Sequence, residues 1–284
     1  MSSSSLSTAQ VILTVSQYYT ICISFIILFS GIFGHMTIIF VLTHLKIFRN
    51  NPSAFYLIAE SVVDLLQIII ILTSRIAMNG FANDLTQASS LWCELRALFV
   101  QSLTLISVNI VCFAAIDQYL STSYYPFLRQ KSTIKLAKIL TIIAIIIWIL
   151  HGTPVFFFFK IQSTYGCYVY NLNFLNYVTY FYYLILTGIL PIIISTFFSV
   201  LAYQNVRRIV RRHMPIRRRK LDQQLTAMIL VRIVFFVVMI LPYILQRIFT
   251  LGIFIKNDNV IYQAIIQLIG AIIISFFHLN YTVC

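Results

Sequence analysis

The carboxylates that could most readily take part in chemistry lie within or beside long apolar runs. Asp64 lies inside one such run, and Asp117 opens the sequence Asp117-Gln118-Tyr119 at the end of another. An ionised carboxylate inside a membrane costs several kcal/mol, so it must be paired, protonated or in contact with a cation. We therefore expect Asp64 and Asp117 to mark polar sites inside the folded chain.

The other ionisable residues do not form the pattern of an enzyme. The chain of 284 residues has seven Asp and Glu residues in total. Its histidines lack a metal-ligand spacing such as His-Glu-x-x-His. They are His35, His44, His151, His213 and His278. We expect no catalytic residues and no cofactor.

The composition indicates a chain that lies in lipid. The sequence is 60% hydrophobic and 10% charged, with a mean hydropathy of +0.92. Runs of about 20 apolar residues can each cross a membrane as a helix, which satisfies its own backbone polar groups. We predict an all-α membrane protein, with a short extracellular tail over 1–16 and a seven-helix bundle over 17–284. The predicted helices cover about 17–43, 53–77, 90–124, 134–159, 174–207, 222–251 and 260–284.

Lysine and arginine residues set the predicted orientation. The net charge of +13 lies mostly in the loops after the first, third and fifth helices, including the run from Arg207 to Lys220. Because cytosolic loops are rich in these residues, we predict that the N-terminus is outside. The same placement argues against nucleic acid as a partner. It favours contact of the basic run with anionic membrane lipids, or with a cytosolic protein.

Two cysteines fall on the predicted outer side. Cys93 opens the third helix, and Cys167 lies in the loop after the fourth. Disulfides form and persist in oxidising compartments outside the cytosol. We predict a Cys93–Cys167 disulfide that pins this loop to the third helix, and the alternative is two unpaired thiols.

Landmark residues are spread over all seven predicted helices. They are Gly34-His35, Asp64, Trp92-Cys93, Asp117-Gln118-Tyr119, Trp148, Pro191, the run from Phe236 to Tyr243 with Pro242 inside it, and Asn280-Tyr281. In these residues the chain resembles the rhodopsin-like (class A) G-protein-coupled receptors over essentially its whole length. It departs from the family at His35, Gln118, Ile240, Tyr281 and Cys284, where the family has asparagine, arginine, tryptophan, proline and tyrosine.

The resemblance implies a sodium site in the middle of the bundle. In the family, the aspartate at the position of Asp64 anchors a sodium ion with help from the third and seventh helices. Ser107 and Asn280 fall on the matching positions. The alternative is an Asp64 side chain that only forms hydrogen bonds between helices.

The resemblance also implies a trigger at the inner end of the third helix. In the family, an arginine at the position of Gln118 pairs with the neighbouring aspartate, and often with an acid at the position of Asp222. Gln118 is neutral, so it can make only a hydrogen bond worth about 1 kcal/mol. We expect a less tightly locked inactive state or weak coupling, and the alternative for Asp222 is a helix cap. Pro242 would permit a kink in the sixth helix.

The family's ligand positions can be carried over to ten residues. They are Arg75, Arg96, Val100, Gln101, Thr104, Tyr243, Gln246, Arg247, Ile266 and Gly270. Val100 stands where amine receptors have an aspartate, so we do not expect a biogenic amine. The three arginines together favour an anionic group, such as the carboxylate of a peptide. The alternative for each arginine is an interaction with lipid headgroups.

These features predict a multi-pass receptor of the plasma membrane. It would convert the binding of an extracellular ligand, with a peptide as one candidate, into activation of a heterotrimeric G protein. The alternative is a non-signalling or decayed membrane protein on the same fold, such as a scaffold or scavenger. Gln118, Ile240 and Tyr281 favour that alternative.

Overall fold

The computed structural model describes residues 3–45, 48, 50–81, 85–162, 166–169, 171–209, 216–253 and 260–282. Within these residues, seven helical segments are long and apolar enough to cross a membrane. They are Leu6–His44, Pro52–Gly80, Ser90–Thr122, Ile134–Phe158, Leu172–Arg208, Gln223–Thr250 and Val260–Asn280. The predicted all-α, seven-helix membrane fold is confirmed.

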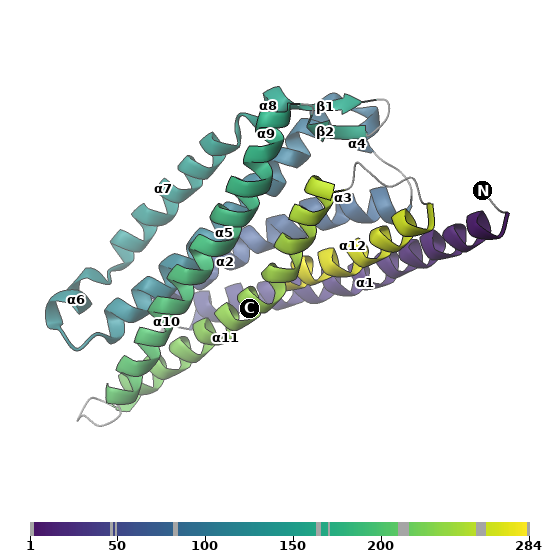
Figure 1. Cartoon of the computed structure of the whole chain (residues 1–284). Coiled ribbons are helices and arrows are strands. Elements are labelled where there is room, and N and C mark those ends of the chain that lie inside the picture. The colour runs from purple at the N-terminus through teal and green to yellow at the C-terminus, as the bar shows by residue number, and fades with distance from the viewer. Residues whose placement is uncertain are drawn as a thin grey trace.

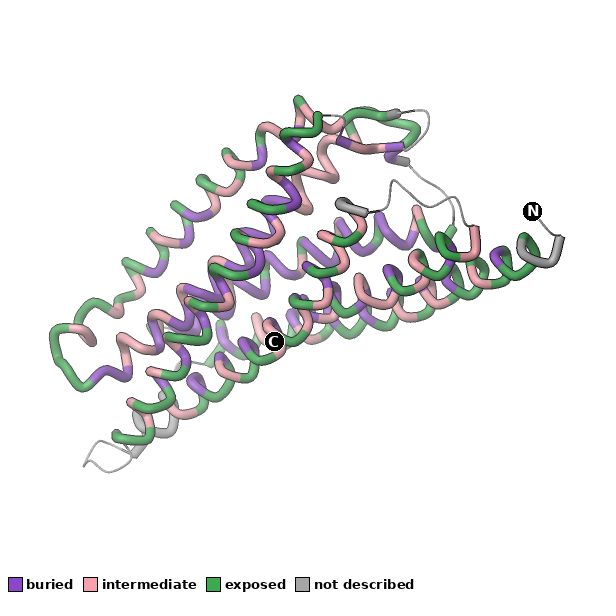
Figure 2. Tube along the Cα trace, viewed as in Figure 1, coloured by how far each residue is buried: buried purple, intermediate pink, exposed green. Residues whose placement is uncertain are grey.

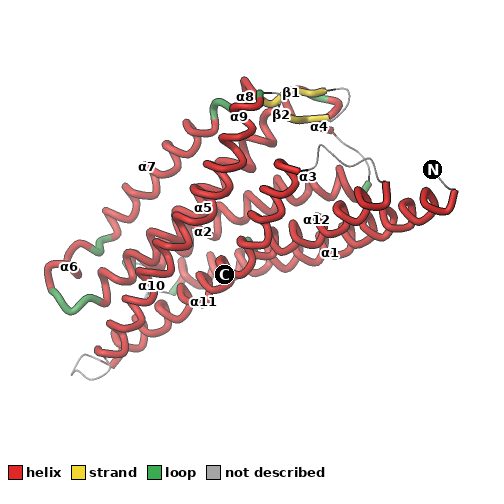
Figure 3. Tube along the Cα trace, viewed as in Figure 1, coloured by secondary structure: helices red, strands yellow, loops and turns green. Residues whose placement is uncertain are grey.

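Several of the segments are built from more than one element. In chain order the elements are α1 (Ser3–His44), α2 (Pro52–Gln67), η1 (Ile68–Leu72), α3 (Thr73–Arg75), η2 (Ile76–Gly80), α4 (Leu85–Ala88), α5 (Ser90–Thr122), α6 (Pro126–Lys131), α7 (Ile134–Gly152), α8 (Val155–Phe158), β1 (Phe159–Gln162), β2 (Gly166–Val169), α9 (Leu172–Asn176), η3 (Tyr177–Ile189), α10 (Leu190–Ile209), α11 (Ile216–Ile253) and α12 (Val260–Asn280). The elements labelled η are π-helical. Figure 3 shows how completely helix dominates the described chain.

Polar residues cap the starts of three of the long helices. The Asn51 side chain accepts hydrogen bonds from the backbone N–H groups of Ser53 and Ala54, at 2.9 and 3.3 Å, and Pro52 occupies the first helical position. In the same way, the side chains of Ser89 and Thr133 cap the first turns of α5 and α7. Such caps satisfy N–H groups that have no partner inside the helix.

The bundle is elongated and its two ends differ. The β1–β2 hairpin, α4 and the N-terminus lie towards one end, whereas α6 and the adjoining ends of α10 and α11 lie at the other (Figure 1). We call these the disulfide end and the Asp117 end, after residues described below. Helix α5 runs through the interior, where it contacts α2, α7, α10 and α11.

The outer helices present apolar side chains to the surroundings. Exposed positions alternate with buried ones along α1 and α7 (Figure 2). Many of these exposed residues are large and apolar, among them Phe29, Phe33, Ile146 and Leu150. Such a surface is expected where lipid tails replace water. This arrangement agrees with membrane lipid as the partner of the bundle's outer surface.

Helices α1 and α12 have different bounds from those predicted. Helix α1 begins at Ser3, so the tail predicted over 1–16 is mostly helical. The run from Ala9 to Val15 is largely apolar and contains no glycine or proline, so nothing interrupts the helix there. At the other end, α12 stops at Asn280, and the N–H groups of Tyr281 and Thr282 bond to carbonyls three residues back, in a turn.

The hairpin at the disulfide end was not predicted from the sequence. Strands β1 and β2 are antiparallel, and Ile161 pairs with Cys167. Gly166 begins β2 with a φ of 70°, a left-handed conformation that glycine adopts at little cost. The hairpin gives the loop after the fourth membrane segment a defined shape.

The fifth membrane segment has wide helical turns before Pro191. In η3 the hydrogen bonds reach five residues back, and the N–H of Leu190 bonds to the carbonyl of Ile185. Turns of this kind are rare and often lie near functional sites. They bring Tyr182 into the buried interior, beside the partly buried Tyr183.

Candidate functional site

A cavity of about 370 Å³ opens at the disulfide end of the bundle. It lies among residues of η1, α3, η2, α5, the hairpin, α9, η3, α11 and α12. Its lining is Ile71, Arg75, Met78, Asn79, Cys93, Arg96, Ala97, Val100, Gln101, Phe159, Cys167, Tyr168, Val169, Leu175, Val178, Tyr182, Tyr183, Tyr243, Arg247, Ile274, Phe277 and His278. The volume is within the roughly 300–1,000 Å³ typical of small-molecule sites.

The hairpin forms one wall of this cavity and is tied to α5. Cys93 and Cys167 form a disulfide, with their Cα atoms 5.7 Å apart, which confirms the predicted pairing. Tyr168 and Val169, next in the chain, also line the cavity. The bridge closes a loop of 74 residues and so restricts the unfolded chain as well as the cavity mouth.

Three arginines reach the cavity from different elements. Arg75 in α3 is 4% exposed, and one terminal nitrogen of its guanidinium donates to the carbonyl of Ala271 at 2.9 Å. In the described part of the chain, its Nε and other terminal nitrogen have no hydrogen-bond partner. Arg96 in α5 donates from Nε to the Ser74 hydroxyl at 2.7 Å. These contacts hold both side chains against the bundle.

The third arginine lies among tyrosines. The guanidinium of Arg247 in α11 is 5.2 Å from the ring centre of Tyr243 and 5.9 Å from that of Tyr183. Its Nε has no hydrogen-bond partner among the residues that the structure describes. Tyr243 also stacks on Phe277, with ring centres 4.0 Å apart. Cation–π contacts of this kind stabilise a guanidinium without neutralising its charge.

The structure brings together six of the ten residues predicted to bind ligand. Arg75, Arg96, Val100, Gln101, Tyr243 and Arg247 line the 370 Å³ cavity. Gln246, Ile266 and Gly270 line a second cavity of about 520 Å³, which shares Arg75 and Arg247 with the first. Thr104 lines neither, and it accepts a hydrogen bond from Gln67 at 3.4 Å.

Sequence reasoning missed several of the lining residues. Tyr182 and Tyr183 of η3 and His278 of α12 all line the 370 Å³ cavity. The aromatic run at 180–183 was a possible signal, but it was read only as part of an apolar helix. Wide π turns change which side chains face inward, so regular helical spacing would not have selected these residues.

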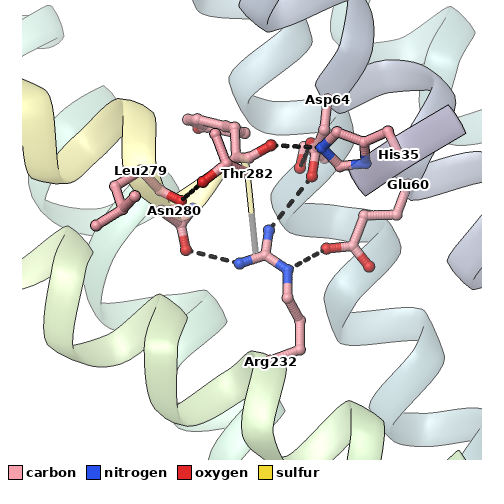
Figure 4. Close-up of polar contacts among 9 residues, drawn as sticks. His35, Glu60, Asp64, Arg232, Leu279, Asn280 and Thr282 are labelled. Atoms are coloured by element: carbon pink, nitrogen blue, oxygen red, sulfur yellow. Dashed lines mark hydrogen bonds and ion pairs between the residues drawn. The ribbon is translucent and has the colours of Figure 1, made fainter. Parts of the chain in front are cut away.

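A second polar site lies in the middle of the bundle and centres on Arg232 of α11. Its Nε donates to Glu60 at 2.5 Å, and one terminal nitrogen donates to Asn280 at 2.7 Å. The other terminal nitrogen is 3.5 Å from Asp64, which also accepts a hydrogen bond from Ser107 at 2.6 Å. Figure 4 shows the guanidinium of Arg232 reaching from α11 to Glu60 and Asp64 of α2 and to Asn280 of α12.

Arg232 and Glu60 were not predicted as site residues. Arg232 stands inside the apolar part of the sixth membrane segment, where a charged residue must have a partner. That rule was applied to Asp64 and could equally have selected Arg232 and Glu60. All three are buried, with 0–5% of each residue exposed.

A third polar cluster lies at the Asp117 end. The two carboxylate oxygens of Asp117 accept hydrogen bonds from Ser53 and Ser132, each at 2.7 Å. Gln118 donates to the Thr226 hydroxyl of α11 at 2.5 Å. Tyr119 packs against Phe198 of α10, with ring centres 5.6 Å apart. The predicted role of Asp222 concerns a side chain outside the described residues.

Residues 34–281 match the model of the 7 transmembrane receptor (rhodopsin family). The chain belongs to this family. A search of the curated proteins found no match. Rhodopsin-family proteins are receptors rather than enzymes, and they generally respond to extracellular ligands and couple to heterotrimeric G proteins. The chain is therefore a multi-pass membrane protein of receptor type.

For a rhodopsin-family receptor, the site around Asp64 is unusual. The expected sodium ion would need oxygen atoms from Asp64 and Asn280, but the Arg232 guanidinium already contacts both. Ser107 donates its hydroxyl proton to Asp64. The chain thus supplies its own positive charge where the ion was expected, and these residues do not fit a bound sodium ion.

Two residues at which the chain departs from the family, His35 of the first helix and Tyr281 after the seventh, lie close together. The Nε2 atom of His35 is 2.5 Å from the backbone carbonyl of Tyr281, and both residues are fully buried. A Cβ atom added at Gly31 would lie 2.9 Å from the Thr282 side chain, so the two helices pass closely here. Histidine therefore bonds the end of α12, where this receptor lacks the family's proline.

Proposed function

We propose that this protein is a cell-surface receptor that converts ligand binding at the disulfide end into G-protein activation at the Asp117 end. One observation carries the proposal: helix α11 belongs to both ends. It lines the 370 Å³ cavity through Tyr243 and Arg247, and it reaches the Asp117 cluster through Thr226. A ligand in the cavity can therefore act directly on the helix that contacts the far end.

Two sets of contacts hold α11 in the described conformation. Arg232 joins it to α2 and α12 through Glu60, Asp64 and Asn280. Thr226 joins it to α5 through Gln118. A ligand that binds better when these contacts are broken will shift the population towards the open state. Gln118 and Arg232 would together replace the family's arginine lock.

Pro242 lies between the two functional parts of α11. Proline has no N–H group, so the helix lacks one backbone hydrogen bond at this point and can bend there. Tyr243 and Arg247 lie on the ligand side of Pro242, and Arg232 and Thr226 lie on the other side. A change at the cavity can thus become a swing of the segment that carries Thr226.

The proposed orientation places the disulfide end outside the plasma membrane. Lysine and arginine residues in the loops of the Asp117 end support it, because cytosolic loops are rich in them. Arg129 and Lys131 of α6 are examples at this end. A heterotrimeric G protein would then meet the Asp117 end, close to the anionic lipids of the inner leaflet.

A non-signalling receptor fold is the second candidate. The observation that favours it is Gln118, whose described side-chain bonds join parts of the bundle to one another. A neutral side chain at this position would leave the G protein without the arginine that the family presents.

Basal nucleotide exchange tests the two candidates. We would measure exchange on a panel of G proteins for surface-verified protein and for a Gln118→Arg variant. Exchange by the unmodified chain is the expected result. Signal only from the arginine variant would support the non-signalling candidate, because the bundle would be intact and the trigger disabled. Silence from both variants would contradict basal coupling.

A further inference from the structure

Arg75 holds a positive charge that the described bundle does not neutralise. Only 4% of the Arg75 residue is exposed, so its side chain does not extend into solvent or towards lipid headgroups. Its described hydrogen bond goes to a backbone carbonyl, and two of its three nitrogens have no partner among the described residues. Buried donors without partners cost stability, so their presence beside a cavity indicates a missing acceptor.

Other polar nitrogens line the same space. Within the described residues, the Nε of Arg247 and the Nδ1 of the buried His278 have no hydrogen-bond partner. Both line the cavity together with Arg75. Arg75 comes from the second membrane segment, Arg247 from the sixth and His278 from the seventh. A group bound here would touch three helices at once.

No aspartate or glutamate lines the described cavity. Within the described residues, neither Arg75 nor Arg247 forms a salt bridge. The nearby acid Glu94 instead pairs with Lys160 of β1, at 2.9 Å. The cavity thus combines several positive donors with no described negative group.

We infer that the cavity binds its ligand through a single oxyanion, a carboxylate, held between Arg75 and Arg247. This inference rests on the proposed receptor function, because it names the class of ligand. Guanidinium groups match carboxylates well, since two parallel N–H groups can bond to the two oxygens. Arg96, on α5, adds a further positive charge to the lining of the same cavity.

The rest of the lining indicates an apolar body for the ligand. Val100, Ile274 and Phe277 line the cavity beside the tyrosines. The volume of about 370 Å³ suits a small organic acid or the last residues of a peptide, and it is too small for a folded partner. Both sources offer the same chemistry, a carboxylate at the end of an apolar chain.

Matched probe pairs test this inference. The unfolding temperature of purified full-length receptor would be measured in a neutral detergent. The probes would be straight-chain carboxylates of increasing length and the corresponding primary amides. A second arm would compare short apolar peptides that carry either a free or an amidated C-terminus. Binding to the folded state raises the unfolding temperature. We expect protection from the charged member of a pair and none from its neutral match.

Variants show whether the protection comes from the cavity. Arg75→Gln and Arg247→Gln should each lower the affinity for the protective carboxylate by about tenfold or more, because a charged donor is lost. Arg75→Lys keeps the positive charge but lacks the two parallel N–H groups of a guanidinium. Its affinity for the carboxylate should lie between those of the glutamine variants and the unmodified protein. Lys160→Gln is the matched control, since Lys160 lies at the same end but already has Glu94 as its partner.

Each outcome is decisive for the ligand class. Equal protection by amides, full protection of both glutamine variants, or no protection by any carboxylate or peptide acid would overturn the inference. Protection by the straight-chain acids points to a small organic acid, and protection by the peptides alone points to a peptide C-terminus. Nucleotide exchange is read separately, so a receptor that signals without carboxylate protection would overturn this inference and leave the proposed function standing.

Discussion

Arg232 and Arg75 are buried to the same extent, but they differ in the charged and hydrogen-bonding partners around them. Each is 4% exposed and each comes from a membrane-spanning segment. Among the described residues, the guanidinium of Arg232 contacts two carboxylates and an asparagine, whereas that of Arg75 contacts one backbone carbonyl and has two nitrogens without partners. The same residue type is thus satisfied in the middle of the bundle and unsatisfied at the cavity.

This difference separates a structural site from a binding site. Arg232 has acidic partners within the chain, so it ties α2, α11 and α12 together. Arg75 has none among the described residues, so its charge remains available to a ligand. Function at the cavity is expected to cost stability, which is a common trade-off in binding sites. Replacing Arg232 should therefore cost much stability, whereas replacing Arg75 should cost little or stabilise the protein.

The largest expected effect comes from Arg232→Met. Removing the guanidinium leaves Glu60 and Asp64 buried without their cationic partner. Breaking a buried ion pair in this way costs about 3–5 kcal/mol of stability. Thermal unfolding of purified receptor in detergent should show a large drop in the transition temperature.

Glu60→Gln in the Arg232→Met background serves as the control. It removes one of the stranded carboxylates, so part of the lost stability should return. Lys160→Met, which breaks an exposed pair, should have little effect. An unfolding transition that Arg232→Met leaves unchanged would show that the central ion pairs do not hold the helices together.

A smaller effect is expected from Thr226→Val at the Asp117 end. This change removes the hydrogen bond from Gln118 and keeps the side-chain shape. The loss is about 1 kcal/mol, and basal nucleotide exchange should rise by about fivefold if that bond favours the closed state. Thr141→Val is the control, because the Thr141 hydroxyl bonds within its own helix. Exchange that rises equally in both variants would argue against a specific role for Thr226.

The smallest effect concerns sodium. Arg232 already contacts Asp64 and Asn280, so exchanging Na⁺ for K⁺ at constant ionic strength should leave the unfolding temperature unchanged. Ligands that bind only the folded state raise that temperature. A clear, saturable stabilisation by Na⁺ over K⁺ in the unmodified receptor would show that an ion binds beside the arginine.

The sequence predicted the parts of this structure that depend on local or compositional signals. The seven membrane segments follow from long apolar runs, and the Cys93–Cys167 disulfide follows from the side of the membrane on which both cysteines are predicted to lie. The arginines of the cavity followed from family positions. These features need no knowledge of how the helices rotate against one another.

The features that were missed depend on packing between distant segments. Arg232 meets Glu60 across 172 residues of sequence, and the meeting requires particular rotations of α2 and α11. Tyr182 faces the cavity because of the π turns in η3, which no periodic pattern reveals. The start of α1 was placed too late because its first turns are polar, although nothing there breaks a helix.

Replacing Arg75 with methionine tests the central comparison most directly. Thermal unfolding of the Arg75→Met variant would be measured beside Arg232→Met and the unmodified receptor, in the same neutral detergent and without added ligand. The account predicts that Arg75→Met is within about 1 kcal/mol of the unmodified protein or more stable, because an unpaired buried charge is removed. A loss as large as that of Arg232→Met would contradict it, since Arg75 would then have an internal partner and no charge left for a ligand.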